Sequence, residues 1–342
     1  MCTININNNS FSNNIIVFYL SVYEAYDLTY GIVAVKIIKK EIFDARELEA
    51  AEIIRRKAKD CPFILDHITQ INSESYQILI NEYANTMTLA IIAEQSDIQL
   101  PTYTLRALMK QIFEGMRAFH ETGLIHRDIK CDNILLHSPP GTGRVHAKIS
   151  DFGFAKKEDG LNEMTYLTGT IPYISPEQLL QNTIITQKVD MYAIGITFYK
   201  LITHKYPVNE RNINEQIKKI AQLKSIERPS EIKDNILWDL LSQLLEFVPN
   251  NRISAAKALQ HPYFISPEAL SDISKEQLDL ASLAAVSEFE GDSSITEFDK
   301  DPTFIESQNV SDQNHKLSKI LISEKKYQNG QRNFLIAKQR QF

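Results

Sequence analysis

The chain has 342 residues, of which 43% are hydrophobic and 23% are charged, and its formal net charge is −6. These values lie near the averages of globular proteins that fold in water, so they exclude collagen-like, fully disordered and membrane-embedded chains. A net negative charge also supplies no field that would hold nucleic acid or an anionic membrane, so neither partner is expected.

The first fourteen residues supply little apolar surface that folding could bury. Six of them are asparagines. Such a composition predicts a disordered leader over residues 1–14.

A small, strand-rich lobe is predicted over residues 15–82. Alternating and β-branched apolar residues predict strands at 17–25, 31–38, 64–71 and 76–81. A charged run at 46–59 predicts one helix between the second and third of these strands.

A larger, mainly helical lobe is predicted over residues 86–264. Apolar residues recur at three- and four-residue spacing over 104–122, which is typical of an amphipathic helix. Further helices are predicted at 189–203, 215–223, 236–245 and 255–260.

Residues 265–342 form a predicted C-terminal tail whose charge reverses along its length. Residues 268–312 contain twelve acidic side chains and two lysines, whereas seven lysines and arginines follow Asp312. An acidic-then-basic segment is typical of a solvated appendage. Within it, residues 267–286 predict an amphipathic helix, which either packs on the large lobe, the favoured interpretation, or docks a partner.

The cysteines and the N-terminal apolar stretch indicate the cellular compartment of the protein. Cys2, Cys61 and Cys131 are odd in number and far apart, which predicts neither a disulfide framework nor a zinc site. The apolar stretch at 15–20 is far shorter than the roughly 20 residues that span a bilayer. We therefore expect a cytoplasmic or nuclear protein with no membrane insertion.

Three short motifs occur in a fixed order along the two predicted lobes. They are VAVK at 33–36, HRDIKCDN at 126–133 and DFG at 151–153, and SPE follows at 175–177. Each is weak evidence alone, but the ordered set resembles the eukaryotic protein kinase family, serine/threonine type, over about residues 15–264. The resemblance implies an α+β, bilobal fold: a small antiparallel sheet with one helix, a hinge at about 82–85 and a large, mainly helical lobe.

The same resemblance implies transfer of the γ-phosphate of ATP, with Mg²⁺, to serine or threonine hydroxyls of a protein substrate. It makes Asp128 the catalytic base and gives Lys130 the task of neutralising the transferred phosphate. Asn133 and Asp151 would be the Mg²⁺ ligands, since that ion prefers carboxylate and other oxygen donors.

Lys36, at the end of VAVK, would contact the α and β phosphates and needs a glutamate to hold it. Glu52 is favoured because it lies sixteen residues after the lysine. Glu49 stays an alternative, because the family usually has an apolar residue one turn after this glutamate. Ile53 follows Glu49 at that spacing, whereas Arg56 follows Glu52.

The resemblance also outlines an adenine site. Its side chains would be Val22 and Ala34 on one face of the base and Leu135 on the other, with hinge backbone groups of Glu82 and Ala84 at its edge. Asn81 occupies the position before the hinge, where its polar side chain either hydrogen-bonds internally or admits inhibitors.

Further positions are expected to shape the large lobe. His126 is expected to pack below Phe152 as a structural residue, and Asp190 to hold the backbone of the catalytic loop. Thr170 is expected to contact the base Asp128 and Lys130. Arg252 is expected to form an ion pair with Glu177.

The chain departs from the family where a glycine-rich loop should cover the phosphates. Ile15, Val17 and Leu20 stand in place of the three glycines. Since glycine lets backbone amides approach phosphate, the loss is expected to weaken ATP binding. Either the loop is truly divergent or a start or splice choice replaced it, and a pseudokinase scaffold is the alternative function.

Control by phosphorylation is also expected. Arg127, which precedes the base, would bind a phosphate on the activation segment. The candidate acceptors are Thr165, Tyr166 and Thr168. A docking partner for the tail is a further possibility.

Overall fold

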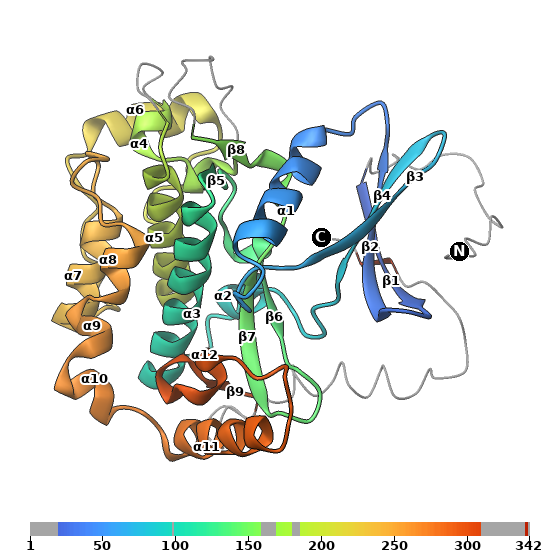
Figure 1. Cartoon of the computed structure of the whole chain (residues 1–342). Helices are drawn as coiled ribbons and strands as arrows, with labels where there is room; N and C mark the ends of the chain where they lie inside the picture. The colour runs from blue at the N-terminus through green and yellow to red at the C-terminus, as the bar shows by residue number, and fades with distance from the viewer. Residues whose placement is uncertain (1–19, 98, 159–168, 180–184, 309–338, 341–342) are drawn as a thin grey trace.

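The computed structural model describes residues 20–97, 99–158, 169–179, 185–308 and 339–340. Two unequal lobes lie side by side (Figure 1), a small one built on a β-sheet and a large one made mainly of helices. The α+β, bilobal fold implied by the motifs is thus confirmed. The leader predicted at 1–14 and the loop positions Ile15 and Val17 lie outside the described residues.

The small lobe is a five-stranded antiparallel sheet in the order β10-β1-β2-β4-β3. Its strands are β1 (Leu20–Asp27), β2 (Gly31–Lys39), β3 (His67–Asn72), β4 (Tyr76–Glu82) and β10 (Gln339–Arg340). The four strands predicted in this lobe are present within a few residues of their expected bounds. The two-residue strand β10, from the far end of the chain, pairs with β1 at the edge of the sheet.

The register of the sheet decides which side chains face the large lobe. Val22 lies opposite Lys36, and Ala34 lies opposite Asn81. Residues directly opposite one another in an antiparallel pair share a face, as do alternate residues of one strand, so these four side chains lie on one face. The other face carries a small apolar cluster, Val33, Val35, Ile78 and Ile80.

The predicted helix of the small lobe is α1 (Ala45–Lys57). It begins at Asp44, whose carboxylate accepts a hydrogen bond from the backbone N–H of Arg46 and so satisfies one of the free N–H groups of the first turn. Ala50 and Ile54 of α1 belong to the main core cluster of the large lobe rather than to the apolar cluster of the small sheet. Consequently α1 couples the two lobes.

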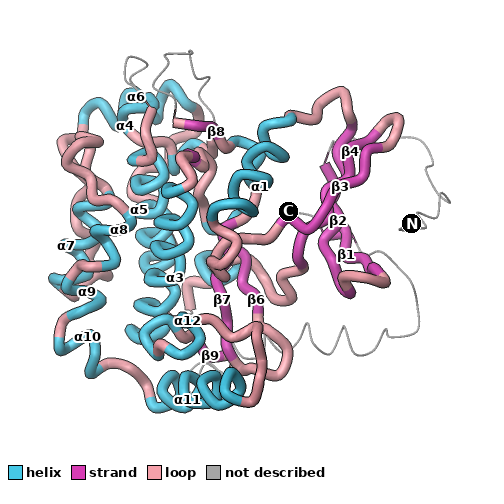
Figure 2. Tube along the Cα trace, in the orientation of Figure 1, coloured by secondary structure: helices cyan, strands magenta, loops and turns pink. Residues whose placement is uncertain are grey.

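The large lobe is organised around two long helices, α3 (Thr102–Glu121) and α5 (Lys188–Thr203), which lie at its centre (Figures 1 and 2). Phe113 of α3 packs edge-on against Phe198 of α5, with ring centroids 5.4 Å apart. The helices around them are α2 (Leu89–Glu94), α4 (Pro176–Leu179), α6 (Ile213–Gln222), α7 (Asn235–Leu244), α8 (Ala255–Leu259) and α9 (Pro262–Ile265). The five helices predicted for this lobe are all present.

Short strands form the part of the large lobe that faces the small one. They are β5 (Leu124–Ile125), which pairs with β8 (Lys156–Lys157), and the hairpin of β6 (Ile134–His137) with β7 (Arg144–Ile149). The catalytic-loop and DFG motifs lie at the ends of these strands. The hairpin therefore brings two motifs that are distant in sequence to one place.

Residues 267–308, called here the C-terminal extension, pack on the large lobe. Their elements are α10 (Pro267–Ser271), α11 (Lys275–Phe289), α12 (Glu297–Lys300), a short 3₁₀ turn (Pro302–Phe304) and β9 (Glu306–Ser307). The single helix predicted at 267–286 is thus two helices, and β9 pairs with β7 of the large lobe. The favoured interpretation, packing on that lobe, is confirmed. Within the described ranges, no helix is long and apolar enough to cross a bilayer.

Candidate active site

Three charged side chains from three separate elements meet at Lys36. Its Nζ lies 2.5 Å from Oε1 of Glu47 on α1 and 3.0 Å from Oδ1 of Asp151, which follows β7. Burial opposes the charge of Lys36, but the attraction of both carboxylates outweighs it and raises the pKa of the lysine. Lys36 is therefore a fixed cation between the lobes, as expected from the motif.

The prediction that Glu52 holds Lys36 is wrong. Glu47 holds it, whereas Glu52 and the alternative Glu49 are both exposed on α1. Successive residues of an α-helix are about 100° apart, so Glu47 shares the buried face of Ala50 and Ile54, and Glu52 points elsewhere. The buried stripe of alanines and isoleucine in α1 is the sequence signal that identifies Glu47.

The DFG segment places Asp151 by an unusual backbone conformation. Asp151 has φ 65° and ψ 78°, in the left-handed region that aspartate tolerates better than most residues. Phe152 is buried, with its ring 5.8 Å from His126 and 5.8 Å from Phe119. Burial lowers the pKa of His126, which keeps the imidazole neutral and fits a structural role.

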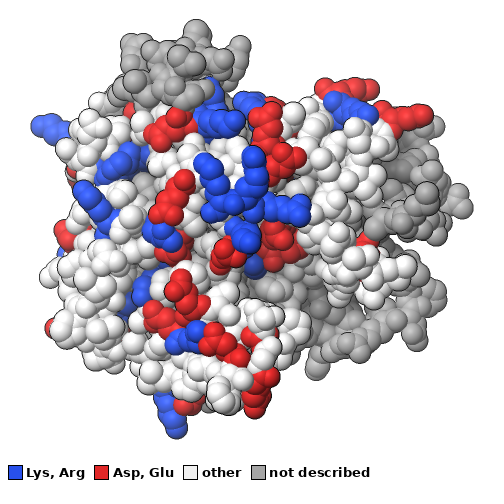
Figure 3. Space-filling model, in the orientation of Figure 1, with Lys and Arg blue, Asp and Glu red and all other residues white. Residues whose placement is uncertain are grey.

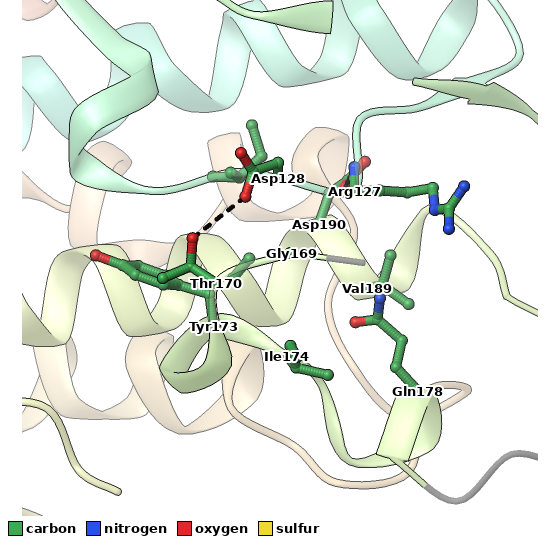
Figure 4. Close-up of a pocket in the computed structure, with 11 residues that line it drawn as sticks. Arg127, Asp128, Gly169, Thr170, Tyr173, Ile174, Gln178, Val189 and Asp190 are labelled. Atoms are coloured by element: carbon green, nitrogen blue, oxygen red, sulfur yellow. Dashed lines mark hydrogen bonds between the residues drawn. The ribbon is translucent and has the colours of Figure 1, made fainter. Parts of the chain in front are cut away.

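Asp128 lies in a polar cluster that fixes its carboxylate. Its Oδ2 accepts hydrogen bonds from Lys130 Nζ and Asn133 Nδ2, each at 2.9 Å. Its Oδ1 lies 3.5 Å from the Thr170 hydroxyl, which also accepts a hydrogen bond from Lys130 at 3.1 Å. Figure 4 shows Asp128 and Thr170 facing each other beside the pocket that they line, with Arg127 pointing away from Asp128. The expected contacts of Thr170 with Asp128 and Lys130 are confirmed.

Asp190 of α5 holds the backbone of the catalytic loop. Its carboxylate accepts hydrogen bonds from the N–H groups of His126 (2.9 Å) and Arg127 (2.8 Å) and lies 2.9 Å from His120 Nε2. Burial alone would raise the pKa of Asp190, but the hydrogen bond and charge of His120 lower it overall. Arg127 can then adopt a φ of 70°, because its N–H is held from a rigid helix. The predicted role of Asp190 is confirmed.

A buried ion pair secures the end of the activation segment. Arg252 donates two hydrogen bonds to Glu177, at 2.6 and 2.9 Å, and both side chains are almost inaccessible. The bidentate geometry satisfies both carboxylate oxygens. This expected pair is confirmed.

The two expected Mg²⁺ ligands emerge from the same end of the β6–β7 hairpin. Ile134 pairs with Ile149, and the backbone oxygen of Asn133 accepts hydrogen bonds from the N–H and hydroxyl of Ser150. Asn133 uses its amide nitrogen on Asp128, at 2.8 Å from the backbone oxygen and 2.9 Å from Oδ2. Its Oδ1 is therefore the atom available to a cation.

The Asp151 carboxylate suits a cation as well. Burial opposes its charge, but Lys36 outweighs burial, so the pKa of Asp151 is lowered and the group is ionised near neutral pH. Its side chain is 37% exposed, so it is open to an incoming ligand. An ionised carboxylate beside an amide oxygen is a donor set that fits Mg²⁺.

The expected adenine residues lie on the elements that flank the hinge. Val22 and Ala34 share the face of Lys36, and Leu135 of β6 is half-buried. At the hinge, the backbone N–H of Glu82 is already bonded to the oxygen of Asp66, and Ala84 is buried. Contact of these residues with ATP stays a prediction.

Asn81 is accounted for within the sheet. Its Oδ1 lies 2.9 Å from Nδ1 of His67, directly across the β3–β4 pair. Of the two interpretations of this position, the structure shows the internal hydrogen bond.

The side chain of Arg127 points away from Asp128 (Figure 4). Burial lowers its pKa, the nearby charge of Arg46 on α1 lowers it further, and the charge of Asp190 raises it. Arg46 is itself paired with Asp44. On the face shown in Figure 3, basic side chains gather beside α1, with acidic ones around them. The expected phosphate acceptors Thr165, Tyr166 and Thr168 lie outside the described residues.

Cys131 lies within the catalytic loop and is fully buried. Burial raises the pKa of its thiol to about 12. A protonated, inaccessible thiol packs as a small apolar group and is not a nucleophile.

Comparison with known proteins agrees with this geometry. The family model described as a protein kinase domain matches residues 19–264. Among curated proteins, the chain is 32% identical over 238 residues to sperm motility kinase 3A of Mus musculus, covering 69% of this chain and 45% of that protein.

Two serine/threonine-protein kinases show similar agreement. ULK3 of Xenopus laevis is 29% identical over 280 residues (80% of this chain, 58% of that protein), and cds1 of Schizosaccharomyces pombe is 30% identical over 249 residues (68% and 52%). The chain spans about half the length of these curated relatives.

Proposed function

The chain belongs to the protein kinase family, and on that premise we propose that it is an active serine/threonine kinase that transfers the γ-phosphate of Mg-ATP to protein hydroxyls. The observation that carries this proposal is the ion triplet of Lys36 with Glu47 and Asp151, because it joins both lobes at one place. Held cations and ionised carboxylates at fixed positions are what phosphoryl transfer requires, since it depends mainly on alignment and charge compensation.

The proposed reaction assigns a task to each side chain of the catalytic loop. Bound Mg-ATP supplies the phosphoryl group and metal ions that offset its charge. Asp128 accepts the proton of the substrate hydroxyl while the hydroxyl oxygen bonds to the γ-phosphorus and the bond to ADP breaks. Its Oδ1 is the atom for this step, because Oδ2 already holds Lys130 and Asn133. Lys130, which lies beside Asp128 and Thr170, compensates the charge of the transferred group.

Asn133 and Asp151 would hold the Mg²⁺ ions, and Lys36 would orient the α and β phosphates. The relatives named above support the choice of serine and threonine as acceptors, because two of them are serine/threonine-protein kinases. The adenine contacts of Val22, Ala34, Glu82, Ala84 and Leu135 belong to the same proposal, as does a location in the cytoplasm or nucleus.

We also propose control by a phosphate on the activation segment. The proximity of Arg127 to Arg46 supports it, since neighbouring guanidinium groups would both donate hydrogen bonds to a phosphate. The acceptor among Thr165, Tyr166 and Thr168 can be identified by mass spectrometry of the purified chain after incubation with Mg-ATP.

A pseudokinase scaffold is the second candidate, and one observation favours it. Ile15, Val17 and Leu20 replace the glycines that would let backbone amides approach the phosphates. Such a protein would keep the fold and act through its partners.

The test is phosphate transfer to a mixed library of serine, threonine and tyrosine peptides by the purified full chain. Wild type is expected to label serine and threonine peptides in the presence of Mg²⁺, and EDTA is expected to stop it. Asp128→Asn should lower labelling about 10²- to 10⁴-fold, while Glu52→Gln, a change on the exposed side of α1, should leave it intact. Wild-type labelling no greater than that of Asp128→Asn would favour the scaffold.

A further inference from the structure

The loop at 58–65 joins α1 to β3 and is attached to the large lobe. The backbone N–H of Ile149 on β7 donates to the oxygen of Phe63, and that of Leu65 donates to the oxygen of Ile149, each at 2.9 Å. The ammonium of Lys148 adds a hydrogen bond to the oxygen of Pro62 at 2.8 Å. The last turn of α1 is thus anchored to β7 through this loop.

The side chain of Phe63 is the packed centre of the loop. The side chain is only 1% exposed, although it belongs to the loop that connects α1 to β3 and lies between the two lobes. Its ring stacks on Phe304 at 5.8 Å and meets Phe298 edge-on at 5.2 Å and His146 at 5.8 Å. Two of these three aromatic neighbours belong to the C-terminal extension, which lies outside the family match.

Those two phenylalanines are themselves fixed to the large lobe. Between them in the chain, Asp299 lies 3.0 Å from Nε of Arg144 and 3.0 Å from Nε2 of His146. The backbone oxygen of Phe304 accepts a hydrogen bond from Gln111 at 2.5 Å, and the Lys110 ammonium lies 4.2 Å above its ring. The extension therefore presents a rigid apolar wall to Phe63.

Movement of this loop would be felt at Glu47. Three residues of this region are buried in the core of the large lobe: Ala50 and Ile54 of α1, and Ala58, which caps its C-terminal end. Glu47 precedes Ala58 by eleven residues along one rigid helix, at about 1.5 Å of rise per residue. A shift or rotation at the end of α1 is therefore transmitted to the carboxylate that holds Lys36.

We propose that Phe298 and Phe304 of the C-terminal extension are positioning residues for phosphoryl transfer. They fix the loop at 58–65 through Phe63, and the loop fixes the rotation of α1 that brings Glu47 to Lys36. The inference rests on the proposed kinase function. It means that residues 297–304, which lie outside the family match, are needed for full catalytic activity.

The test compares the full chain with the double variant Phe298→Ala/Phe304→Ala. The matched control is Leu280→Ala, which removes an apolar side chain of the same extension that approaches Gly143. Hydrogen exchange is followed by mass spectrometry in α1 and, as a reference, in α5. We expect faster exchange in α1 of the double variant, no change in α5, and wild-type behaviour of the control.

Kinetics supply the second readout. Because a displacement of about 1 Å can cost roughly a hundredfold in rate, we expect kcat of the double variant to fall about 10- to 100-fold with little change in the peptide KM. In a Glu47→Gln background the same two substitutions should cost little more, since they act through Glu47. Independent, fully additive losses would contradict this coupling.

The outcomes separate the inference from the proposed function. A wild-type chain without kinase activity defeats the proposed function, yet the exchange of α1 still decides whether the extension fixes the helix. Unchanged exchange in α1 overturns the inference, whatever the activity. Should the double variant not fold, Phe304→Leu and Phe63→Leu are measured instead, and the same increase confined to α1 is required.

Discussion

Lys36 shows how a single residue combines burial with charge. Its side chain is almost enclosed, and an isolated ammonium there would lose its proton or unfold its surroundings. Two carboxylates from opposite sides keep it charged, one on α1 and one after β7. The geometry of this site therefore depends on Glu47 as much as on Asp151.

We predict that Glu47→Gln lowers kcat/KM for ATP-dependent phosphorylation about a hundredfold, because the neutral amide no longer fixes the lysine beside the phosphates. Steady-state kinetics measure the effect. Glu52→Gln is the matched control on the same helix and should keep the wild-type value. Equal losses in both variants would show that Glu47 has no special role.

A further residue-level prediction concerns the buried pair of Arg252 and Glu177. Arg252→Met leaves a carboxylate buried without its partner, which costs about 3–5 kcal/mol in the free energy of unfolding. Urea denaturation checks this value. Arg252→Met with Glu177→Met should recover much of the loss, since no buried charge then stays unpaired. A single variant as stable as wild type would contradict the prediction.

At the level of elements, β9 contains an unusual buried acid. Burial, opposed by a hydrogen bond from Thr104 and aided by the nearby charge of Glu276, raises the pKa of Glu306 to about 8. The folded chain thus keeps a proton on Glu306 that the unfolded chain releases near pH 4.5. Between these two values unfolding liberates a proton, so stability falls as pH rises.

We predict that the free energy of unfolding of wild type decreases by a few kcal/mol, as an order of magnitude, between about pH 5 and pH 8 relative to Glu306→Gln. Urea denaturation at a series of pH values measures the difference between the two proteins. Glu268→Gln, on the exposed surface of α10, is the control and should follow wild type. Parallel pH curves for wild type and Glu306→Gln would refute a buried, protonated acid.

The elements also show what sequence reveals and what it conceals. Periodicity predicts the strands of the small lobe and long helices such as α3, because each buries one regular face. It does not give the rotation of α1 about its axis. The spacing from Lys36 counts residues and does not show which side of the helix a residue occupies, so it favours Glu52 where the structure has Glu47. In the C-terminal extension the sequence predicts a helix at 267–286 and favours its packing on the large lobe. It does not predict α12 or β9, because these elements are too short to show a period and the acidic charge resembles that of a solvated tail.

For the whole molecule, the site is assembled from both lobes. Motifs in fixed order predict Asp128, Lys130, Asn133 and Asp151, because chemistry fixes those residue types. Because Ile15, Val17 and Leu20 stand in place of the family's glycines, turnover of ATP is the property of the whole molecule that the next measurement tests.

Single-turnover transfer from Mg-ATP, measured beside ATP affinity on the same protein, tests the central claim most directly. Wild type should bind ATP and phosphorylate a serine or threonine peptide, and Asp128→Asn should keep the affinity while losing about 10²- to 10⁴-fold in rate, as expected for a missing general base. A wild-type chain that binds ATP but transfers phosphate no faster than Asp128→Asn would contradict the account.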